Sequence, residues 1–298
     1  MKTAIIIANP LSGKYSGRMA HRFTEHLEKL GFSVTIHELE REERVGGIIA
    51  QLNCESLSLI VLMAGDGTIN SALSALVSRN DHEQFTVALV PIGTANILSK
   101  ELGVDSIEKS MRAIEYGAIK KLHMGRVIAK DGNVKNTSHF ALMASAGFDS
   151  QVVNNVSNRL KKIIGGLAYV CEFAKLLFGG PFLELKTEVD GVTYRNILTC
   201  VSNGRYYGVK IPVTGSHVEE NNFDVIIIEK MKKINLLPTL CCLFRNKDNK
   251  SIIRLTGKNN VTITADVEHC PLQIDGDYHC DLPVRVESSD MYINMYYL

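Results

Sequence analysis

The sequence lacks any marked excess of charge, because 33 lysines and arginines stand against 32 aspartates and glutamates, for a net charge of +1. No nucleic-acid partner is therefore expected, since such a partner calls for a basic surface. The sequence also lacks a run of about 20 apolar residues, the length that crosses a bilayer as a helix. The N-terminal segment MKTAIIIANP has one lysine and too short an apolar run for a signal peptide.

The regular cysteine spacing that is typical of small disulfide-bonded domains is missing as well. The seven cysteines are scattered over 298 residues, which favours reduced thiols in the cytoplasm. The 45% hydrophobic and 22% charged residues that are present are typical of a globular protein. We therefore expect a soluble, cytoplasmic protein that is at most peripheral to a membrane.

The first part of the chain alternates between strand-like and helix-like segments. Strands are predicted at Thr3–Ala8 and Leu57–Met63, and also at FSVTIHEL and FTVALV. Apolar residues at helical spacing follow each of these strands. Because strands that alternate with helices favour parallel pairing, we predict an α/β domain with a doubly wound, mostly parallel sheet over residues 1–122.

The pattern changes after residue 122. The segments VIAKDGNVK and TEVDGVTYRN each place Asp-Gly between alternating residues, which predicts antiparallel hairpins. Short strands continue from there, interrupted by predicted helices near 150–178 and 232–245. We predict a β-rich antiparallel domain over 123–286, with a strand at about 287–298 that returns to the first domain. We expect the two halves to pack closely around a cleft.

Residues 9 to 17, NPLSGKYSG, follow the first predicted strand directly. They do not form a P-loop, because Ala8 and Tyr15 stand where that motif requires Gly and Ser or Thr. Small residues, backbone N–H groups, Lys14 and a following helix nevertheless suit a phosphate loop. The alternative is an ordinary Asn-Pro turn with a solvated lysine.

Residues 65 to 70, GDGTIN, connect a predicted strand to a helix. They are not the dinucleotide fingerprint, because Asn70 occupies the place of its third glycine. A carboxylate beside a polyphosphate repels it unless a divalent cation lies between them. We therefore interpret Asp66 as a magnesium-linked or ribose-contacting group. The alternative is a tight turn in which Asp66 is the N-cap of the helix.

A third loop, VPIGTAN, ends the next predicted strand and brings Thr94 and Asn96 to the same edge. Each loop alone is weak evidence of a site. Three such loops after three strands of one parallel sheet converge on one crevice, which favours a ligand site.

These three loops, in this order and spacing, resemble the diacylglycerol kinase catalytic-domain family, which includes bacterial lipid kinases, sphingosine kinases and ceramide kinases. The resemblance continues through SAGFDSQVV (145–153), VSNGRYYGVKIPV (201–213) and LQIDGDYHCDLPVRV (272–286), and so covers nearly the whole chain. It implies ATP-dependent phosphorylation of a lipid hydroxyl, with Mg²⁺ as the cofactor of ATP. It also implies a nucleotide-binding α/β domain and a β-rich lipid-binding domain, with the active site in the cleft between them.

The resemblance also implies roles for individual residues. The acidic motif of the family, usually Asp-Gly-Glu, is here Asp275-Gly276-Asp277, which makes Asp275 the general base. An ordinary aspartate pKa of about 3.9 would leave it ionised at pH 7. The alternative for IDGD is one more Asp-Gly hairpin. Asp66 is the second catalytic acid, through Mg-ATP, and the nucleotide-binding residues are Asn9, Pro10, Ser12, Gly13, Lys14, Gly65, Asp66, Gly67, Thr68, Asn70, Gly93, Thr94 and Asn96.

Two departures from the family pattern bear on metal and substrate. An aspartate that often follows Gly-Thr-Ala-Asn is replaced by Ile97, which slightly favours the sphingolipid branches. Some members hold a structural magnesium on an Asp-Gly-x-Leu-Asp loop. Here the corresponding residues would be Glu220 and Asp224, so this second metal site is doubtful.

The segments 159–180 and 230–247 each join basic residues to an apolar stretch. They are either core helices with solvated lysines or an interfacial surface that reaches lipid. We expect ATP and a lipid as substrates and a peripheral membrane surface as a partner. Diacylglycerol, ceramide and a sphingoid base remain open as acceptors, because apolar pockets discriminate weakly. The alternatives are a soluble kinase similar to NAD kinase and a non-catalytic lipid-binding relative. The sequence contains no indication of the oligomeric state.

Overall fold

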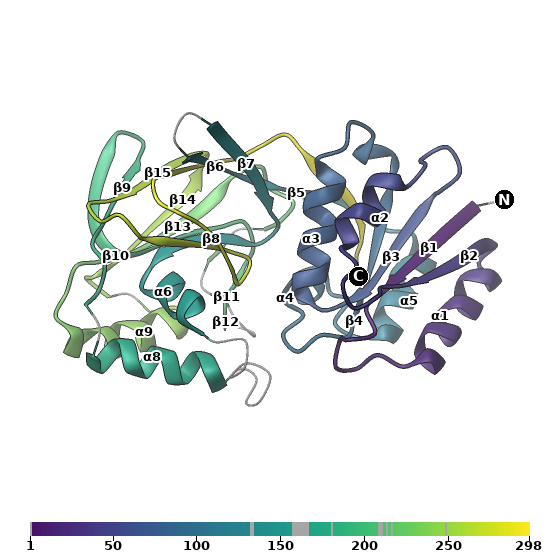
Figure 1. The fold of residues 1–298 in the computed structure, drawn as a ribbon, viewed down its shortest axis with the longest axis horizontal. Coiled ribbons are helices and arrows are strands. Elements are labelled where there is room, and N and C mark those ends of the chain that lie inside the picture. The colour runs from purple at the N-terminus through teal and green to yellow at the C-terminus, as the bar shows by residue number, and fades with distance from the viewer. Residues whose placement is uncertain are drawn as a thin grey trace.

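The structure is a computed structural model that describes residues 2–131, 134–156, 167–179, 181–207, 211–212, 214–215, 217–247 and 249–298. It has an α/β domain at the right of Figure 1 and a β-rich domain at the left. This confirms the predicted fold class. Among the described residues, no helix is long and apolar enough to span a membrane.

The N-terminal domain is built on a six-stranded sheet in the order β2-β1-β3-β4-β19-β5. Neighbouring strands pair in parallel, except that β5 is antiparallel to β19. The strands are β1 (Lys2–Ala8), β2 (Phe32–Glu38), β3 (Leu59–Ala64), β4 (Thr86–Pro91), β5 (Ile119–His123) and β19 (Tyr292–Tyr296).

Helices cover both faces of this sheet, as a doubly wound fold requires. Successive side chains of a strand point to opposite faces. Ile6 of β1 therefore packs with Phe23 on one face, whereas Ile7 packs with Leu73 on the other. The helices are α1 (Gly17–Lys29), α2 (Val45–Gln51), α3 (Asp66–Val77), α4 (Ile97–Glu101) and α5 (Ile107–Tyr116), with the short 3₁₀ helix η1 (His82–Gln84).

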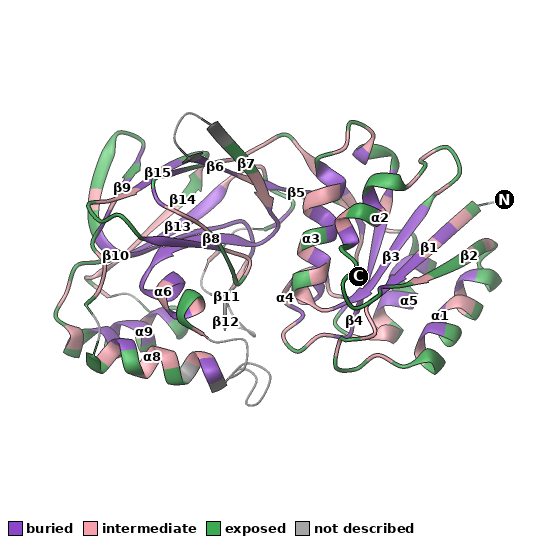
Figure 2. Ribbon diagram, viewed as in Figure 1, coloured by how far each residue is buried: buried purple, intermediate pink, exposed green. Residues whose placement is uncertain are grey.

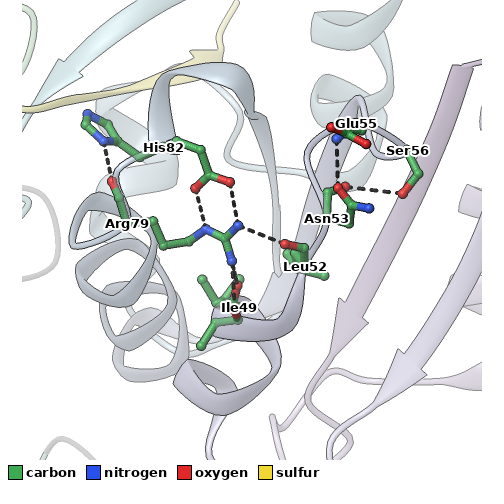
Figure 3. A network of polar contacts seen from close by, with 9 residues as sticks. Ile49, Leu52, Asn53, Glu55, Ser56, Arg79 and His82 are labelled. Carbon is green, nitrogen blue, oxygen red and sulfur yellow. Dashed lines mark hydrogen bonds and ion pairs between the residues drawn. The ribbon is translucent and has the colours of Figure 1, made fainter.

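Arg79 ties α3 to the end of α2 (Figure 3). Its guanidinium donates to Ile49 O at 2.7 Å and to Leu52 O at 2.8 Å, and so supplies partners for carbonyls at a helix C-terminus. It also donates two hydrogen bonds of 2.7 Å to Asp81, which lower the pKa of that carboxyl group to about 2. This network fixes the outer end of α3 and leaves the first turn of the helix for the site.

The C-terminal domain contains an 11-stranded sheet in the order β17-β16-β8-β10-β9-β15-β18-β6-β7, with β13 paired to β10 and β14. Adjacent strands are antiparallel, and β6 and β9 form the predicted hairpins with β7 and β10. The tip of the first hairpin, residues 132–133, lies outside the described residues. The strands are β6 (Gly125–Asp131), β7 (Val134–Phe140), β8 (Met143–Gly147), β9 (Leu185–Val189), β10 (Val192–Ser202), β13 (Phe223–Glu229), β14 (Ile252–Lys258), β15 (Asn260–Ala265), β16 (Pro271–Ile274), β17 (Asp277–Asp281) and β18 (Val284–Glu287); β11 (Tyr206–Tyr207) and β12 (Ile211–Pro212) pair separately.

Helices lie on one side of this domain, and Figure 2 shows them below the buried strands. They are α6 (Phe148–Asn155), α8 (Leu167–Gly179), the short 3₁₀ helix η2 (Lys233–Asn235) and α9 (Leu236–Phe244). Leu176 of α8 and Leu240 of α9 share one buried cluster with residues of β10 and β13. The two predicted helical regions are therefore present, although the segment 157–166 is not described.

The last strand crosses from the β-rich domain into the N-terminal sheet. β19 inserts between β4 and β5, and Asn294 pairs with Thr86 on one side and with Lys121 on the other. The boundary that the sequence suggests near residue 122 falls within β5. Because β5 and β19 are adjacent, two chain segments connect the domains at one place.

Candidate active site

Three loops meet at the carboxyl edge of the parallel sheet. The side-chain amide of Asn9 donates to Thr68 Oγ1 at 2.8 Å, and its backbone N–H donates to Met63 O at 3.0 Å. The backbone N–H of Lys14 donates to Ile92 O at 3.3 Å. The loops after β1, β3 and β4 are therefore joined by hydrogen bonds, at the edge of the sheet where α/β folds bind ligands.

Two glycines make this approach possible. A Cβ atom on Gly93 would lie 2.6 Å from the Cα of Gly65 and 2.8 Å from Asn96 Oδ1. Any side chain at Gly93 would push the two loops apart, because it would collide with the Cα of Gly65 and with the side chain of Asn96, which is hydrogen-bonded within its loop. A Cβ atom on Gly65 would lie 3.8 Å from Ser12 Oγ, so the first loop joins the same contact.

Asp66 links the second and third loops. It is the first residue of α3, whose N-cap is Gly65, so the alternative that made Asp66 the N-cap is wrong. Its Oδ2 accepts the N–H of Asn96 at 2.7 Å, and its Oδ1 accepts the N–H of Ile97 at 2.8 Å. A carboxylate has about four lone-pair positions, so about two stay available for a cation or a ribose.

The remaining nucleotide-binding candidates differ in what their side chains can reach. Asn96 has a left-handed backbone (φ 51°), and its amide exchanges two hydrogen bonds of 2.9 Å with the backbone of Gly93. It therefore shapes its own loop. Lys14 and Thr94 are exposed at the same edge. Pro10 and Gly13 lie in the turn before α1, and their contacts with a nucleotide stay predictions.

Asp275 is both a turn residue and an anchored carboxylate. Asp275 (φ 50°) and Gly276 (φ 94°) connect β16 to β17, so the hairpin alternative is correct for the backbone. The carboxylate reaches the junction of β7 and β8. Its Oδ2 accepts the N–H of Ala141 at 2.9 Å, and its Oδ1 accepts the N–H groups of Leu142 and Met143 at 2.9 Å and 2.8 Å.

The pKa of Asp275 is not that of an ordinary aspartate. Burial of the carboxyl group raises its pKa to about 6, although the residue keeps some exposed surface. The three N–H donors oppose this rise, and the negative charge of Asp66 adds to it. The expectation of a pKa near 3.9 is therefore wrong, because it ignored desolvation. Asp66 is therefore close enough for its charge to contribute to the raised pKa of Asp275.

A cavity of about 390 Å³ separates α3 from the hairpin. Gly67, Asn70 and Ser74 line it from α3, His139 lines it from β7, and Asp275 and Asp277 line it from the other side, together with Ser71, Ala75, Ser78, Ser138, Ile274, Tyr278 and His279. Two of the predicted nucleotide-binding residues, Gly67 and Asn70, therefore line the same cavity as the candidate base Asp275.

The surroundings of Glu220 and Asp224 give little support to the second metal site, which the sequence already left doubtful. Glu220 is exposed, whereas Asp224 is buried and accepts the N–H of Gly215 at 2.9 Å. Within the described ranges, no group of three or more His, Cys, Asp or Glu side chains could hold a metal ion. The same finding covers the cavity, so a cation there would also need oxygen ligands from phosphates.

Sequence reasoning missed the partners that hold Asp275. The N–H donors at residues 141–143 lie more than 130 positions away in the chain. Gln273 also went unnoticed, although its Oε1 accepts the N–H of Gly276 at 2.7 Å. The local signal in the sequence is a glutamine, Gln273, that stands three residues before the glycine of an Asp-Gly turn.

Two family profiles match the chain in succession. The diacylglycerol kinase catalytic domain matches residues 3–127, and the YegS C-terminal NAD kinase beta sandwich-like domain matches residues 142–296. The chain belongs to the diacylglycerol kinase family. It is therefore a lipid kinase. Membership of a kinase family also implies a nucleotide substrate and a divalent metal.

Relatives within the diacylglycerol kinase family match over almost their full length. A diacylglycerol kinase of Bacillus subtilis (strain 168) is 24% identical, with 95% of this chain and 92% of the relative covered. A diacylglycerol kinase of Staphylococcus carnosus (strain TM300) is 23% identical, with 99% and 95% covered. This breadth supports one family for both domains.

Solved structures show the same fold. A diacylglycerol kinase from Bacillus anthracis str. Sterne has a TM-score of 0.70 at 17% identity, with 100% of this chain and 97% of that chain covered. The yeast NADH kinase in complex with NADH has a TM-score of 0.58 at 13% identity, with 100% and 84% covered. The two-domain plan is therefore common to lipid and dinucleotide kinases.

Proposed function

We propose that this lipid kinase transfers the γ-phosphate of ATP, bound with Mg²⁺, to a hydroxyl group of a lipid, and that Asp275 is the general base. The observation that supports this most strongly is the position of Asp275. Its carboxylate is held by three backbone N–H groups at a cavity whose opposite wall begins at Gly67. A base opposite a phosphate-binding edge is what transfer to an alcohol requires.

The phosphates belong, in this proposal, at the edge formed by the three loops. Lys14 offers an exposed ammonium group there, and the first turn of α3 offers unpaired N–H groups. Asp66 would hold the cation with its remaining lone pairs while its hydrogen bonds to Asn96 and Ile97 keep the loops together. Bound magnesium would neutralise charge on the phosphoryl group.

Asp275 would accept the proton of the lipid hydroxyl as the phosphoryl group arrives. Its raised pKa of about 6 makes it a stronger base than an ordinary aspartate while leaving most molecules ionised at pH 7. The three N–H groups fix the direction of the carboxylate, so that little reorganisation is needed during reaction. General-base catalysis of this kind typically contributes about 10²–10⁴-fold to the rate.

The acceptor is tested with radiolabelled ATP against separate lipids. Diacylglycerol comes first, because the relatives carry its name. Ceramide and a sphingoid base follow, since Ile97 favours the sphingolipid branches. NAD tests the soluble-kinase alternative. Phosphorylation of one of the lipids supports the proposal, whereas labelling of NAD alone, or of nothing, overturns it in favour of a dinucleotide kinase or a non-catalytic relative.

We also propose that the kinase reaches its lipid from the membrane surface through the outer face of α8, η2 and α9. The inner face of these helices belongs to the core, as Leu176 and Leu240 show. The outer face exposes Phe178 and Ile234 at 85% and 80%. Exposed basic residues lie on or next to the same helices in the chain. Lys175 and Lys230 are paired with Glu172 and Glu184, and the others are Lys232, Arg245 and Lys247. Apolar and cationic groups together favour an anionic bilayer surface.

Flotation with vesicles of phosphatidylglycerol and phosphatidylcholine tests this surface. The wild-type kinase should bind at low salt and detach as salt rises, because added salt screens lysine charges beyond about 10 Å at 0.1 M. Phe178→Ser together with Ile234→Ser should weaken binding. Val192→Ser is the matched control, because Val192 is 51% exposed on a distant hairpin. Equal binding of all three proteins would overturn the assignment.

A further inference from the structure

Gln273 holds the peptide that carries the candidate base. It lies on β16 and is 3% exposed. Its Oε1 accepts the backbone N–H of Gly276 at 2.7 Å, and its Nε2 donates to Ser145 Oγ at 2.6 Å. The side chain therefore spans from the core of the sheet to the turn. Both ends of its amide are used, so the glutamine has a single orientation that satisfies them.

The partners of Gln273 are themselves fixed by the first turn of α6. Ser145 Oγ donates to the Asp149 carboxylate, and the other oxygen of Asp149 accepts the N–H of Ser150 at 2.7 Å. Ser150 Oγ in turn contacts Pro271 O at 2.6 Å, at the start of β16. All these residues are buried. The network thus forms a closed ring from β16 through β8 and α6 and back to β16.

The turn lies beyond an irregular stretch of the β16–β17 ladder, and its other backbone anchor is the N–H of Asp275, which donates to Met143 O at 3.0 Å. A register shift between Leu272 and Gln273 interrupts the β16–β17 ladder just before Asp275. Asp275 is held on one side by the N–H groups of residues 141–143. The Asp275–Gly276 peptide plane is held on the other side by Gln273. Loss of this contact would free the ψ angle of Asp275 and the φ angle of Gly276, and with them the tight turn from which the carboxylate projects.

We propose that Gln273 is a positioning residue for catalysis, which acts on Asp275 through the N–H of Gly276 and is itself aligned by Ser145 and Asp149. It does not touch the substrate. The inference rests on the proposed role of Asp275 as general base. Displacement of a catalytic group by about 1 Å can reduce a rate by about 10²-fold, so loss of the Gly276 contact should lower turnover rather than nucleotide affinity.

Gln273→Met keeps the length and volume of the side chain and removes both hydrogen bonds. We expect kcat on the lipid acceptor to fall by about tenfold or more, with the KM for ATP changed by less than about twofold. The matched control is Asn196→Leu. Asn196 is a buried amide in β10 that bonds Thr187 Oγ1 at 3.0 Å and accepts from Thr199 at 3.0 Å, away from the turn.

The comparison of these two variants separates positioning from stability. Both lose buried hydrogen bonds, so both should melt at a lower temperature. Only Gln273→Met should lose kcat when each is assayed well below its melting temperature. Equal kcat in the two variants would overturn the inference.

Gln273→Glu gives a second test, in which the hydrogen bonds of the side chain are changed by pH and not removed by truncation. A protonated glutamic acid can accept from Gly276 and donate to Ser145, as the amide does, whereas an ionised one cannot donate. The kcat of this variant relative to wild type should therefore rise as the pH is lowered. The corresponding ratio for Gln273→Met should not change with pH. A ratio for the Glu variant that is independent of pH would contradict the proposed contact.

Failure of the inference and failure of the proposed function give different results. If Asp275→Asn abolishes turnover while Gln273→Met behaves like Asn196→Leu, Asp275 stays the base and Gln273 is only a core residue. If Asp275→Asn retains turnover, the base itself is misassigned.

Discussion

Two hairpins of the β-rich domain turn on the same pair of residues, Asp-Gly, with nearly the same backbone. Asp190 and Asp275 have φ values of 51° and 50°, and the glycines that follow have φ values of 79° and 94°. The side chains nevertheless differ. Asp190 is exposed and pairs with Lys258 at 2.5 Å. Asp275 accepts three backbone N–H groups and faces the cavity.

The difference teaches that a turn motif determines the backbone but not the role of its acid. An Asp-Gly turn places an aspartate in the left-handed region wherever two strands need a tight connection. What surrounds the side chain then depends on which strands lie beside the hairpin. β9 and β10 carry their turn out to solvent, whereas β16 pairs with β8 and brings its turn to the β7–β8 junction.

The largest expected effect is on turnover. Asp275→Asn should lower kcat by about 10² or more, because the proposed base is lost, whereas Asp190→Asn should leave kcat unchanged. The asparagine amide also turns an N–H group toward at least one of the three backbone donors, so part of the loss comes from displacement. Steady-state kinetics with a melting curve for each variant measures both. Similar kcat values for the two variants would contradict the proposal that only Asp275 acts in catalysis.

The dependence of activity on pH should show the next largest effect. A general base acts when it is deprotonated, and burial raises the pKa of Asp275 to about 6. Activity should therefore approach its maximum about one unit above pH 6, be half-maximal near pH 6, and fall by about tenfold per unit well below it. kcat/KM measured from pH 4.5 to 8 gives the profile. Asp190→Asn should retain this acid limb, and the residual activity of Asp275→Asn should lack it.

The smallest expected effect concerns the glycines of the two turns. Neither Gly191 nor Gly276 has an atom within 4 Å of an added Cβ, so an alanine meets only backbone strain. Each Gly→Ala change should lower the free energy of unfolding by about 1–2 kcal/mol. Chemical denaturation measures this loss. Only Gly276→Ala should also lower kcat, by severalfold, because its turn carries the base. A drop in kcat for Gly191→Ala would indicate a general effect of hairpin stability instead.

The sequence predicted the fold well because its evidence is local. Strand and helix positions follow from the spacing of residues such as Phe23 and Leu27, which one helix brings to the same face. The convergence of the three loops follows from parallel pairing, and the Asn9–Thr68 contact agrees with it. These inferences need no knowledge of distant contacts.

The chemistry of the site was less predictable because it depends on distant neighbours. Asp66 bonds N–H groups that lie 30 and 31 positions later in the chain, so its position in α3 and its loop contacts were not visible. The pKa of Asp275 depends on burial by another part of the domain. The two hydrogen bonds that the Asn96 amide makes within its own loop were also not visible, and its contact with a nucleotide stays a prediction.

The insertion of β19 between β4 and β5 has a consequence for biosynthesis. The slot between these strands stays empty until residues 292–296 have left the ribosome, although β4 and β5 emerge long before. The nucleotide-binding domain is therefore the first to begin folding and the last to finish. A nascent chain that stops short of β19 has an open sheet edge at β4, which invites pairing with other chains. Each ribosome thus makes the whole β-rich domain before the kinase can close its own sheet.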